Sequence, residues 1–167
     1  MAINAYLKLE TPAIKGDCTA GDHTDDIEVL NWNHGFSQPT SATRSSAGGG
    51  TVEQASHQPM SLSKYIDSAT SQLLKTCWSG KTIGTATLFC YRASGAEDNK
   101  AVLYLKVVMT DVVISNQSLS GGGGDLPVEN LALDYGTVQY TYTLQKDDGT
   151  AGGNKPAKHD LMKRAIS

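Results

Sequence analysis

The sequence predicts a mainly β fold, an antiparallel barrel or sandwich with a single α-helix packed on it. Most segments alternate apolar and polar residues with the period of a half-buried strand, and glycine-rich or acidic turns separate them. Only residues 67–80 show apolar side chains at helical spacing. A chain of 167 residues suits one domain, which we expect to span residues 1–149. Residues 150–167 contain glycine and lysine with little to bury, so we expect a flexible C-terminal tail there.

The strands are predicted from their alternation, and a long loop interrupts the first half of the chain. Strands are expected at residues 5–10, 27–39, 51–66 (as one strand or two), 81–92, 101–115, 128–134 and 137–145. The loop is residues 40–50, TSATRSSAGGG. Loops of this length without structure of their own are uncommon in compact domains and usually have a role.

The one predicted helix spans Asp67–Gly80. Asp67 or Ser68 can cap the free N–H groups of its first turn, and Gly80 can take the left-handed conformation after its last turn. Leu73 and Trp78 fall on one apolar stripe, so we expect the helix to pack by this face. Trp78, like Trp32, is therefore interpreted as a core anchor and not as a ligand-stacking residue.

The predicted strand at residues 101–115 is apolar on both faces. A strand of a small barrel normally buries one face and leaves the other in water. We therefore expect the helix or another subunit to cover the second face. The candidate subunit-interface residues are Val102, Tyr104, Val108, Val112 and Ile114.

The strand at residues 137–145 has one apolar face and one polar face without charge. The polar face consists of Thr137, Gln139, Thr141, Thr143 and Gln145. Hydroxyl and amide groups offer hydrogen bonds without a strong electrostatic field. Such a surface repels few partners and holds few of them tightly.

Four consecutive glycines lie between the predicted strands at residues 101–115 and 128–134. The run is Gly121, Gly122, Gly123 and Gly124, followed by Asp125 and Pro127. A phosphate-binding loop would need a lysine and a following helix, whereas here an aspartate and a strand follow. We interpret the run as a tight turn where side chains would obstruct, with Pro127 entering the next strand at its first residue, where a missing donor is harmless.

Composition excludes several classes of function. The 14 basic and 17 acidic residues argue against a nucleic-acid binder, which would carry a basic surplus. No apolar run approaches the length of a membrane-spanning helix, so no membrane insertion is expected. The first residues lack the basic and apolar regions of a cleavable signal peptide. The three cysteines form no CxxC pair and are expected to be reduced thiols.

No motif predicts catalysis, a metal site or a cofactor. His34 could act as a general base, but no nucleophile or orienting carboxylate is marked near it, so a packed, hydrogen-bonded histidine is favoured. His57 and His159 stand alone in the sequence and receive the same interpretation. The acidic segment 17–26 could bind a cation weakly, and a solvated turn is favoured. The sequence therefore predicts a protein that is not an enzyme.

Several segments in order resemble one family. These are EVLNWNHGFSQP, KYID before a helix and SGK, and GGGGDLP before YG. Together they resemble the hemolysin-coregulated proteins, the tube proteins of bacterial type VI secretion systems, over about Ala5 to Gly149. One departure is Ser71, where many relatives start the helix with a proline; serine is tolerated in a first turn.

The resemblance implies a small antiparallel β-barrel of two sheets flanked by one α-helix, which assembles into hexameric rings. The rings stack into a tube that a contractile sheath drives with a spike at its tip. The glycine turn would lie at the rim or inner edge of the ring, where side chains would obstruct. It implies that small effector proteins travel in the lumen, and that the protein passes from the bacterial cytoplasm to the medium or a target cell. The polar face of residues 137–145 becomes a candidate lumen wall, although it could instead look outward. The loop that would reach a neighbouring ring or subunit includes Thr40, Ser41, Arg44, Gly48, Gly49 and Gly50.

A second interpretation is a monomeric or dimeric β-barrel module that recognises a small protein or a glycan through its loops. Its oligomeric state would separate it from a tube subunit. A third, a toxin fused to the same domain, would need a catalytic extension, and the segment after residue 145 is too short for one.

Overall fold

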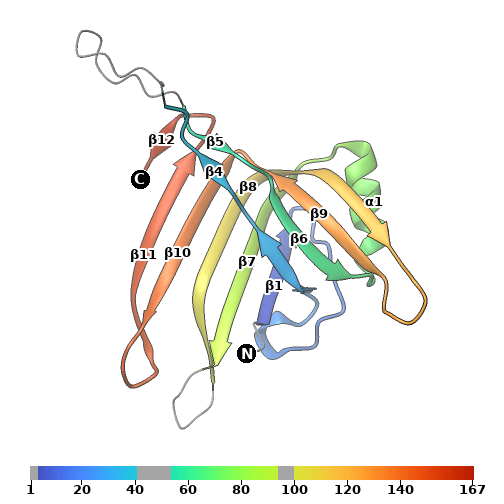
Figure 1. Ribbon diagram of the computed structural model, residues 1–167, viewed down its shortest axis with the longest axis horizontal. Helices are drawn as coiled ribbons and strands as arrows, with labels where there is room; N and C mark the ends of the chain where they lie inside the picture. Colours follow the sequence, from blue (N-terminus) through green and yellow to red (C-terminus); the bar gives the residue numbers. More distant parts are fainter. Residues whose placement is uncertain (1–3, 41–53, 94–99) are drawn as a thin grey trace.

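The computed structural model describes residues 4–40, 54–93 and 100–167. It confirms a mainly β fold with a single α-helix in the described part of the chain (Figure 1). The helix is α1 (Thr70–Ser79). The strands are β1 (Asn4–Glu10), β2 (Ile27–Val29), β3 (Asn31–Asn33), β4 (Phe36–Ser37), β5 (Ser56–His57), β6 (Met60–Tyr65), β7 (Ile83–Ala93), β8 (Ala101–Ser120), β9 (Val128–Asp134), β10 (Thr137–Gln145), β11 (Ala151–Asp160) and β12 (Ala165–Ile166).

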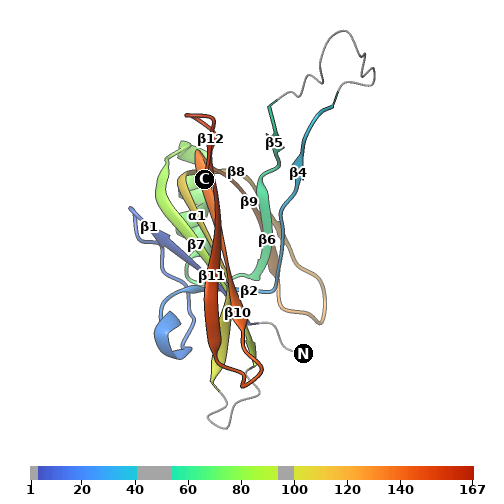
Figure 2. The same cartoon turned by 90° about the vertical axis from the view of Figure 1, so that its left-hand side faces the viewer.

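The strands form two layers that share β8. One layer has the order β12-β11-β10-β8-β7-β1-β2, and β9, β6 and β3 continue from β8 as the second layer. Figure 2 shows the second layer facing the first. The layers meet again where the chain passes from β2 to β3, because the N–H of Leu30 donates to the carbonyl of Ser63 at 2.8 Å. The result is a flattened antiparallel barrel, as predicted.

The core fills the space between the layers. Leu7 of β1 lies opposite Ile27 of β2 and Leu88 of β7, and Leu88 lies opposite Val107 of β8. All four side chains are fully buried. Because cross-strand neighbours on one face touch, this row forms a continuous apolar layer across four strands.

Strand β8 bends at Asp111, and the bend explains why its sequence is apolar on both faces. Before the bend Val107 and Met109 face the core; after it Val112 and Ile114 do. Asp111 has φ of 53°, outside the strand region, so the alternation changes phase there. The prediction that Val112 and Ile114 contact another subunit is therefore wrong, since both are buried inside their own subunit.

The helix is shorter than predicted and packs where β8 changes layers. Asp67 lies before its first turn and accepts the N–H of Ala69 at 3.0 Å. Gly80 ends the helix with φ of 64°, as expected from its freedom to adopt this conformation. Leu73 is fully buried, but Trp78 is 76% exposed, so its predicted place in the core is wrong. Trp32 is partly buried against the core.

Residues 27–39 form three short strands and not one long strand. The breaks fall at Leu30, where the chain changes layers, and at His34 and Gly35, after which β4 leaves the barrel. In the described part of the chain, β4 and β5 pair only with each other and form a separate two-stranded sheet. Figures 1 and 2 show this hairpin extending beyond the end of the second layer.

The expected flexible tail is wrong for most of its length, because residues 151–160 form β11. This strand pairs with β10 from Thr137 opposite Asp160 to Gln145 opposite Ala151. It buries little and is held by backbone hydrogen bonds, so its polar composition hid it from a search for apolar alternation. Pro156 and lysines are typical of strands near the edge of a sheet, where they discourage unwanted pairing.

Candidate functional site: assembly faces and buried polar clusters

The polar face of β10 lies on the side of the first layer that points away from the core. Its Gln139 lies between Val108 of β8 and Lys158 of β11. Val108 and Gln139 are both half-buried, whereas Val107 and Val138 on the opposite side are buried. The structure therefore brings a predicted interface residue and a predicted lumen residue together on one face.

The same face carries cations that the sequence of β10 alone did not show. Thr141 lies opposite Lys106 of β8, whose ammonium group is 5.5 Å from the centre of the Phe89 ring. Thr137 lies opposite Thr110. The face is thus rich in threonine, with lysines at its margins, and offers hydroxyl groups and isolated charges to a partner.

The apolar face of β10 is only partly covered. Tyr142 and Leu144 are each 39% exposed, because the second layer does not extend over this end of the strand (Figure 1). Val102 and Tyr104 are half-buried nearby on β8, and the Tyr104 ring lies 5.6 Å from the Arg92 guanidinium carbon. Sequence analysis missed Tyr142 and Leu144 because alternation predicts a face and not the extent of the layer that covers it.

Most of the predicted ring-contact loop cannot be placed. Thr40 is described and exposed, whereas Ser41, Arg44, Gly48, Gly49 and Gly50 lie outside the described residues. The hairpin of β4 and β5 joins this segment to the barrel on both sides.

The glycine run forms a turn between two strands, as predicted, since Ser120 lies opposite Val128 on either side of it. Within the subunit, a Cβ atom at Gly122, Gly123 or Gly124 would meet nothing within 4 Å, so the obstruction expected at the rim or inner edge of a ring stays a prediction. Only Gly124, with φ of 108°, has a backbone conformation that favours glycine. Pro127 directly precedes β9 and accepts the N–H of Ile66 through its carbonyl at 3.1 Å.

Three histidines that are distant in sequence lie in one hydrogen-bonded chain with two tyrosines. His34 bonds to the hydroxyl groups of Tyr140 and, at 2.7 Å, Tyr135. The Tyr135 hydroxyl also bonds to His57 Nδ1 at 2.8 Å, and His57 Nε2 bonds to His159 Nδ1 at 2.8 Å. We call this set the histidine–tyrosine chain. The prediction of packed, hydrogen-bonded histidines is confirmed, but His57 and His159 do not stand alone.

Burial shifts the pKa values of four of these five groups in the direction that favours their neutral forms. Burial lowers the pKa of His34, and burial followed by the nearby His159 lowers that of His57. Burial also raises the pKa of Tyr140 to about 12 and that of Tyr135 further. Imidazoles and hydroxyls that remain neutral can each both donate and accept, so the chain can be complete without a charge.

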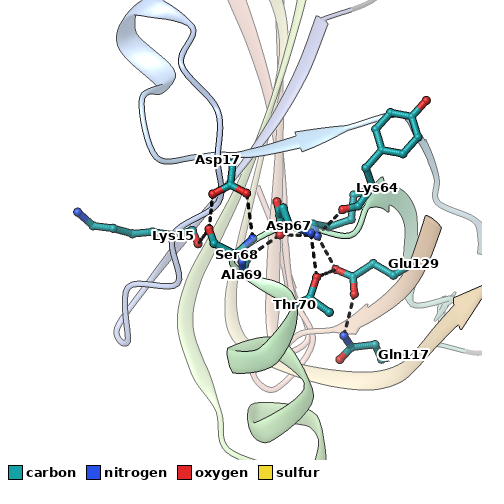
Figure 3. Close-up of polar contacts among 10 residues, drawn as sticks. Lys15, Asp17, Lys64, Asp67, Ser68, Ala69, Thr70, Gln117 and Glu129 are labelled. Carbon is teal, nitrogen blue, oxygen red and sulfur yellow. Dashed lines mark hydrogen bonds and ion pairs between the residues drawn. The ribbon is translucent and has the colours of Figure 1, made fainter. Parts of the chain in front are cut away.

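A second polar cluster is built on ion pairs between charged side chains (Figure 3). Lys64 of β6 and Glu129 of β9 lie directly opposite each other and are fully buried. The Lys64 ammonium group donates to Glu129 Oε1 at 2.5 Å, Asp67 Oδ1 at 2.7 Å and the Tyr65 carbonyl at 2.8 Å. Thr70, the first residue of α1, also donates to Glu129 at 3.3 Å. We call this set the lysine–glutamate network; it fastens the start of the helix to the second layer.

The acidic segment 17–26 contains a buried pair. His23 Nδ1 lies 2.8 Å from Asp26 Oδ2, and His23 Nε2 lies 2.7 Å from the Tyr91 hydroxyl. The cysteines of the described chain are free thiols. No group of three or more histidine, cysteine, aspartate or glutamate side chains among the described residues could hold a metal ion. In the same part of the chain, no helix is long and apolar enough to cross a membrane.

Comparison with known proteins identifies the relatives of this barrel. The family model described as "Type VI secretion system effector, Hcp" matches residues 6–142. Protein hcp1 of Pseudomonas aeruginosa is 35% identical over 160 residues, which cover 95% of this chain and 94% of that protein.

Solved structures agree with this relationship. The crystal structure of Hcp1 from Salmonella typhimurium superimposes with a TM-score of 0.79 at 28% identity, and the match covers 100% of both chains. A structure described as a type six secretion system protein gives a TM-score of 0.86 at 27% identity, covering 99% of this chain and 100% of that one. The chain belongs to the Hcp family of type VI secretion system proteins.

Proposed function

We propose that this protein is a tube subunit of a bacterial type VI secretion system, which assembles into hexameric rings that stack into a tube. Family membership supports the role. The structural observation that carries the assembly is the exposure of Tyr142 and Leu144 at the uncovered end of β10. An exposed apolar surface that continues the core-facing side of a strand is typical of a contact with another subunit.

The outer face of the first layer supplies the second surface of the ring. Val108 and Gln139 lie side by side on it. At this position the surface would therefore face either the lumen or another subunit. We assign the threonine-rich part around Thr141 to the lumen wall and the half-buried Val108 to the margin of the subunit contact. Hydroxyl groups can accept different cargo surfaces without strong selection by charge.

The partners follow from this role. The tube would contact the spike and the contractile sheath, and small effector proteins would travel in its lumen. The protein would act without catalysis, and would leave the bacterial cytoplasm through its own machine. The segment carried by β4 and β5 would reach a neighbouring ring.

The first experiment is light scattering of the purified protein, followed by electron microscopy of the same sample. Six times the subunit mass and an annular image would support the proposal. A monomer at high micromolar concentration would contradict it and favour a binding module that uses its loops.

Two aspartate variants on β8 separate assembly from folding. Val108→Asp places a charge on the outer face, so we expect loss of rings with the fold retained. Val112→Asp places a charge in the core, so we expect a loss of more than about 4 kcal/mol of stability, enough to unfold many domains. Light scattering and circular dichroism measure the two effects. Rings that persist in Val108→Asp would exclude this face from the contact.

A further inference from the structure

The hairpin of β4 and β5 continues the paired strands β3 and β6 beyond the barrel, with a backbone hydrogen bond from the N–H of Gln58 to the carbonyl of Gly35 at 2.9 Å between the two pairs. Its two strands form backbone hydrogen bonds with each other, and no other strand in the described part of the chain pairs with them. An isolated two-stranded hairpin is at best marginally stable in water. Its placement against β10 and β11 therefore depends on the side chains that join it to these strands.

Those side chains are the histidine–tyrosine chain and one phenylalanine. His34 precedes β4 and His57 lies in β5, whereas Tyr135, Tyr140 and His159 belong to the barrel or to β11. Phe36 of β4 packs against the ring of Tyr140 with the ring centres 5.9 Å apart. Phe36 itself is 52% exposed, so this packing alone buries little apolar surface. The polar chain thus provides most of the specific contacts at this junction.

Four hydrogen bonds link the five groups, and each bond holds one proton. With neutral imidazoles, His34, His57 and Tyr135 supply one proton each, and one end of the chain supplies the fourth. One additional proton on His34 or His57 can be placed if both ends of the chain accept. A second additional proton has no place, because two N–H groups would then face each other or the Tyr135 hydroxyl would lose its acceptor.

Apart from a backbone group of Gln58 that favours protonated His34, the surroundings do not compensate a positive charge here. Among the described residues, no carboxylate forms an ion pair with His34, His57 or His159; the other titratable groups at the junction are Tyr135, Tyr140, Lys158, Asp134 and Cys90. Asp134 is exposed and precedes Tyr135, whereas Lys158 adds a like charge next to His159. The remaining histidine, His23, is different, because its Nδ1 faces a carboxylate, Asp26 Oδ2, at 2.8 Å.

We propose that the histidine–tyrosine chain is a pH-sensitive latch. It fastens the hairpin to β10 and β11 at neutral pH and releases it when the imidazoles together take up two additional protons. The release is local, since the barrel sheets do not depend on these four hydrogen bonds. The inference rests on the proposed function only for its consequence, because the hairpin carries the segment that we propose to reach a neighbouring ring. Mild acid would then weaken the contact between rings.

Hydrogen–deuterium exchange of the full chain, measured by mass spectrometry at pH 7.5 and pH 5.5, tests the latch. After correction for the intrinsic pH dependence of exchange, the peptide that covers residues 54–60 should exchange at least about tenfold faster at pH 5.5. In the released hairpin the histidines regain their ordinary pKa, and one pH unit below it the protonated form exceeds the neutral form about tenfold. Peptides from β7 should not change. Faster exchange across the whole chain, or no change at residues 54–60, would overturn the proposal.

Variants identify the groups responsible. In His34→Gln/His57→Gln, exchange at residues 54–60 should no longer depend on pH, whereas His23→Gln should retain the full response. If β7 of the double variant is not protected from exchange, the double variant is not folded. The single variant His57→Gln then replaces it and should show a smaller response to pH. An unchanged response in the folded variant would show that other groups act. Light scattering at pH 7.5 tests the ring independently, so a failed latch and a failed ring are distinguishable.

Discussion

The lysine–glutamate network and the histidine–tyrosine chain each hold a peripheral element on the same barrel, but they do so with different chemistry. The network fastens α1 with full charges in a site that water does not reach. The chain fastens the hairpin of β4 and β5 with neutral groups at a partly exposed junction. A buried ion pair is destabilising to break but contains no histidine, the side chain whose ordinary pKa lies between pH 5 and 8. The comparison indicates a permanent attachment for the helix and a conditional one for the hairpin.

Removal of one charge of the network should have the largest effect. Glu129→Ala leaves the Lys64 ammonium group buried with a weaker set of partners, and breaking a buried pair in this way costs about 3–5 kcal/mol. The free energy of unfolding from urea titration at neutral pH measures the loss.

The matched control replaces both charges. Lys64→Met/Glu129→Leu removes the need to solvate either group, so we expect it to recover most of the stability that Glu129→Ala loses. A double variant as unstable as the single one would show that the network orders the start of α1 through Thr70 and Asp67, and not only through neutralisation of Lys64.

Removal of the central hydroxyl of the histidine–tyrosine chain should have a smaller effect. Tyr135→Phe leaves His34 Nε2 and His57 Nδ1 without their partner, at a cost of about 1–3 kcal/mol for unsatisfied buried groups. Tyr142→Phe is the control on the exposed end of β10 and should change stability by less than about 0.5 kcal/mol. Equal effects in the two variants would indicate that water replaces the Tyr135 hydroxyl without loss.

The two clusters also differ in how far the sequence could have predicted them. Lys64 shares the inward phase of its strand with Met60 and Leu62, and Glu129 shares that of Leu131 and Leu133. A charged residue at the core phase of two alternating strands is a readable signal of a buried pair. No comparable signal existed for the histidines. His34 and His57 meet at the Tyr135 hydroxyl, and His159 joins them only through the return of β11 along β10, a strand that the pattern of apolar residues did not predict.

The bend of β8 illustrates the same limit. Alternation predicted a strand from residue 101 and gave its apolar residues correctly, but it assumed one phase throughout. The change of phase at Asp111 depends on a backbone conformation that aspartate adopts more readily than most residues but that its presence does not require. Sequence reasoning thus identified the barrel, the turn at Gly124 and the family, and misassigned the faces of the strand that joins the layers.

The smallest expected difference between the two attachments is in the pH dependence of the free energy of unfolding. His34 and His57 have pKa values lowered by burial in the folded protein, whereas in the unfolded chain they take their ordinary value of 6.5. As the pH falls through 6.5, the unfolded state therefore binds protons first, and the folded state loses stability; above about pH 7.5 this contribution is constant.

Urea midpoints between pH 8 and 5.5, where carboxylates of ordinary pKa remain charged, should decrease with acid in the wild-type protein. Glu129→Ala should show the same slope at a lower level, because it leaves the histidines in place, and His34→Gln/His57→Gln should show a smaller slope. A slope that disappears in Glu129→Ala would assign the acid sensitivity to the network and reverse the distinction between the two clusters.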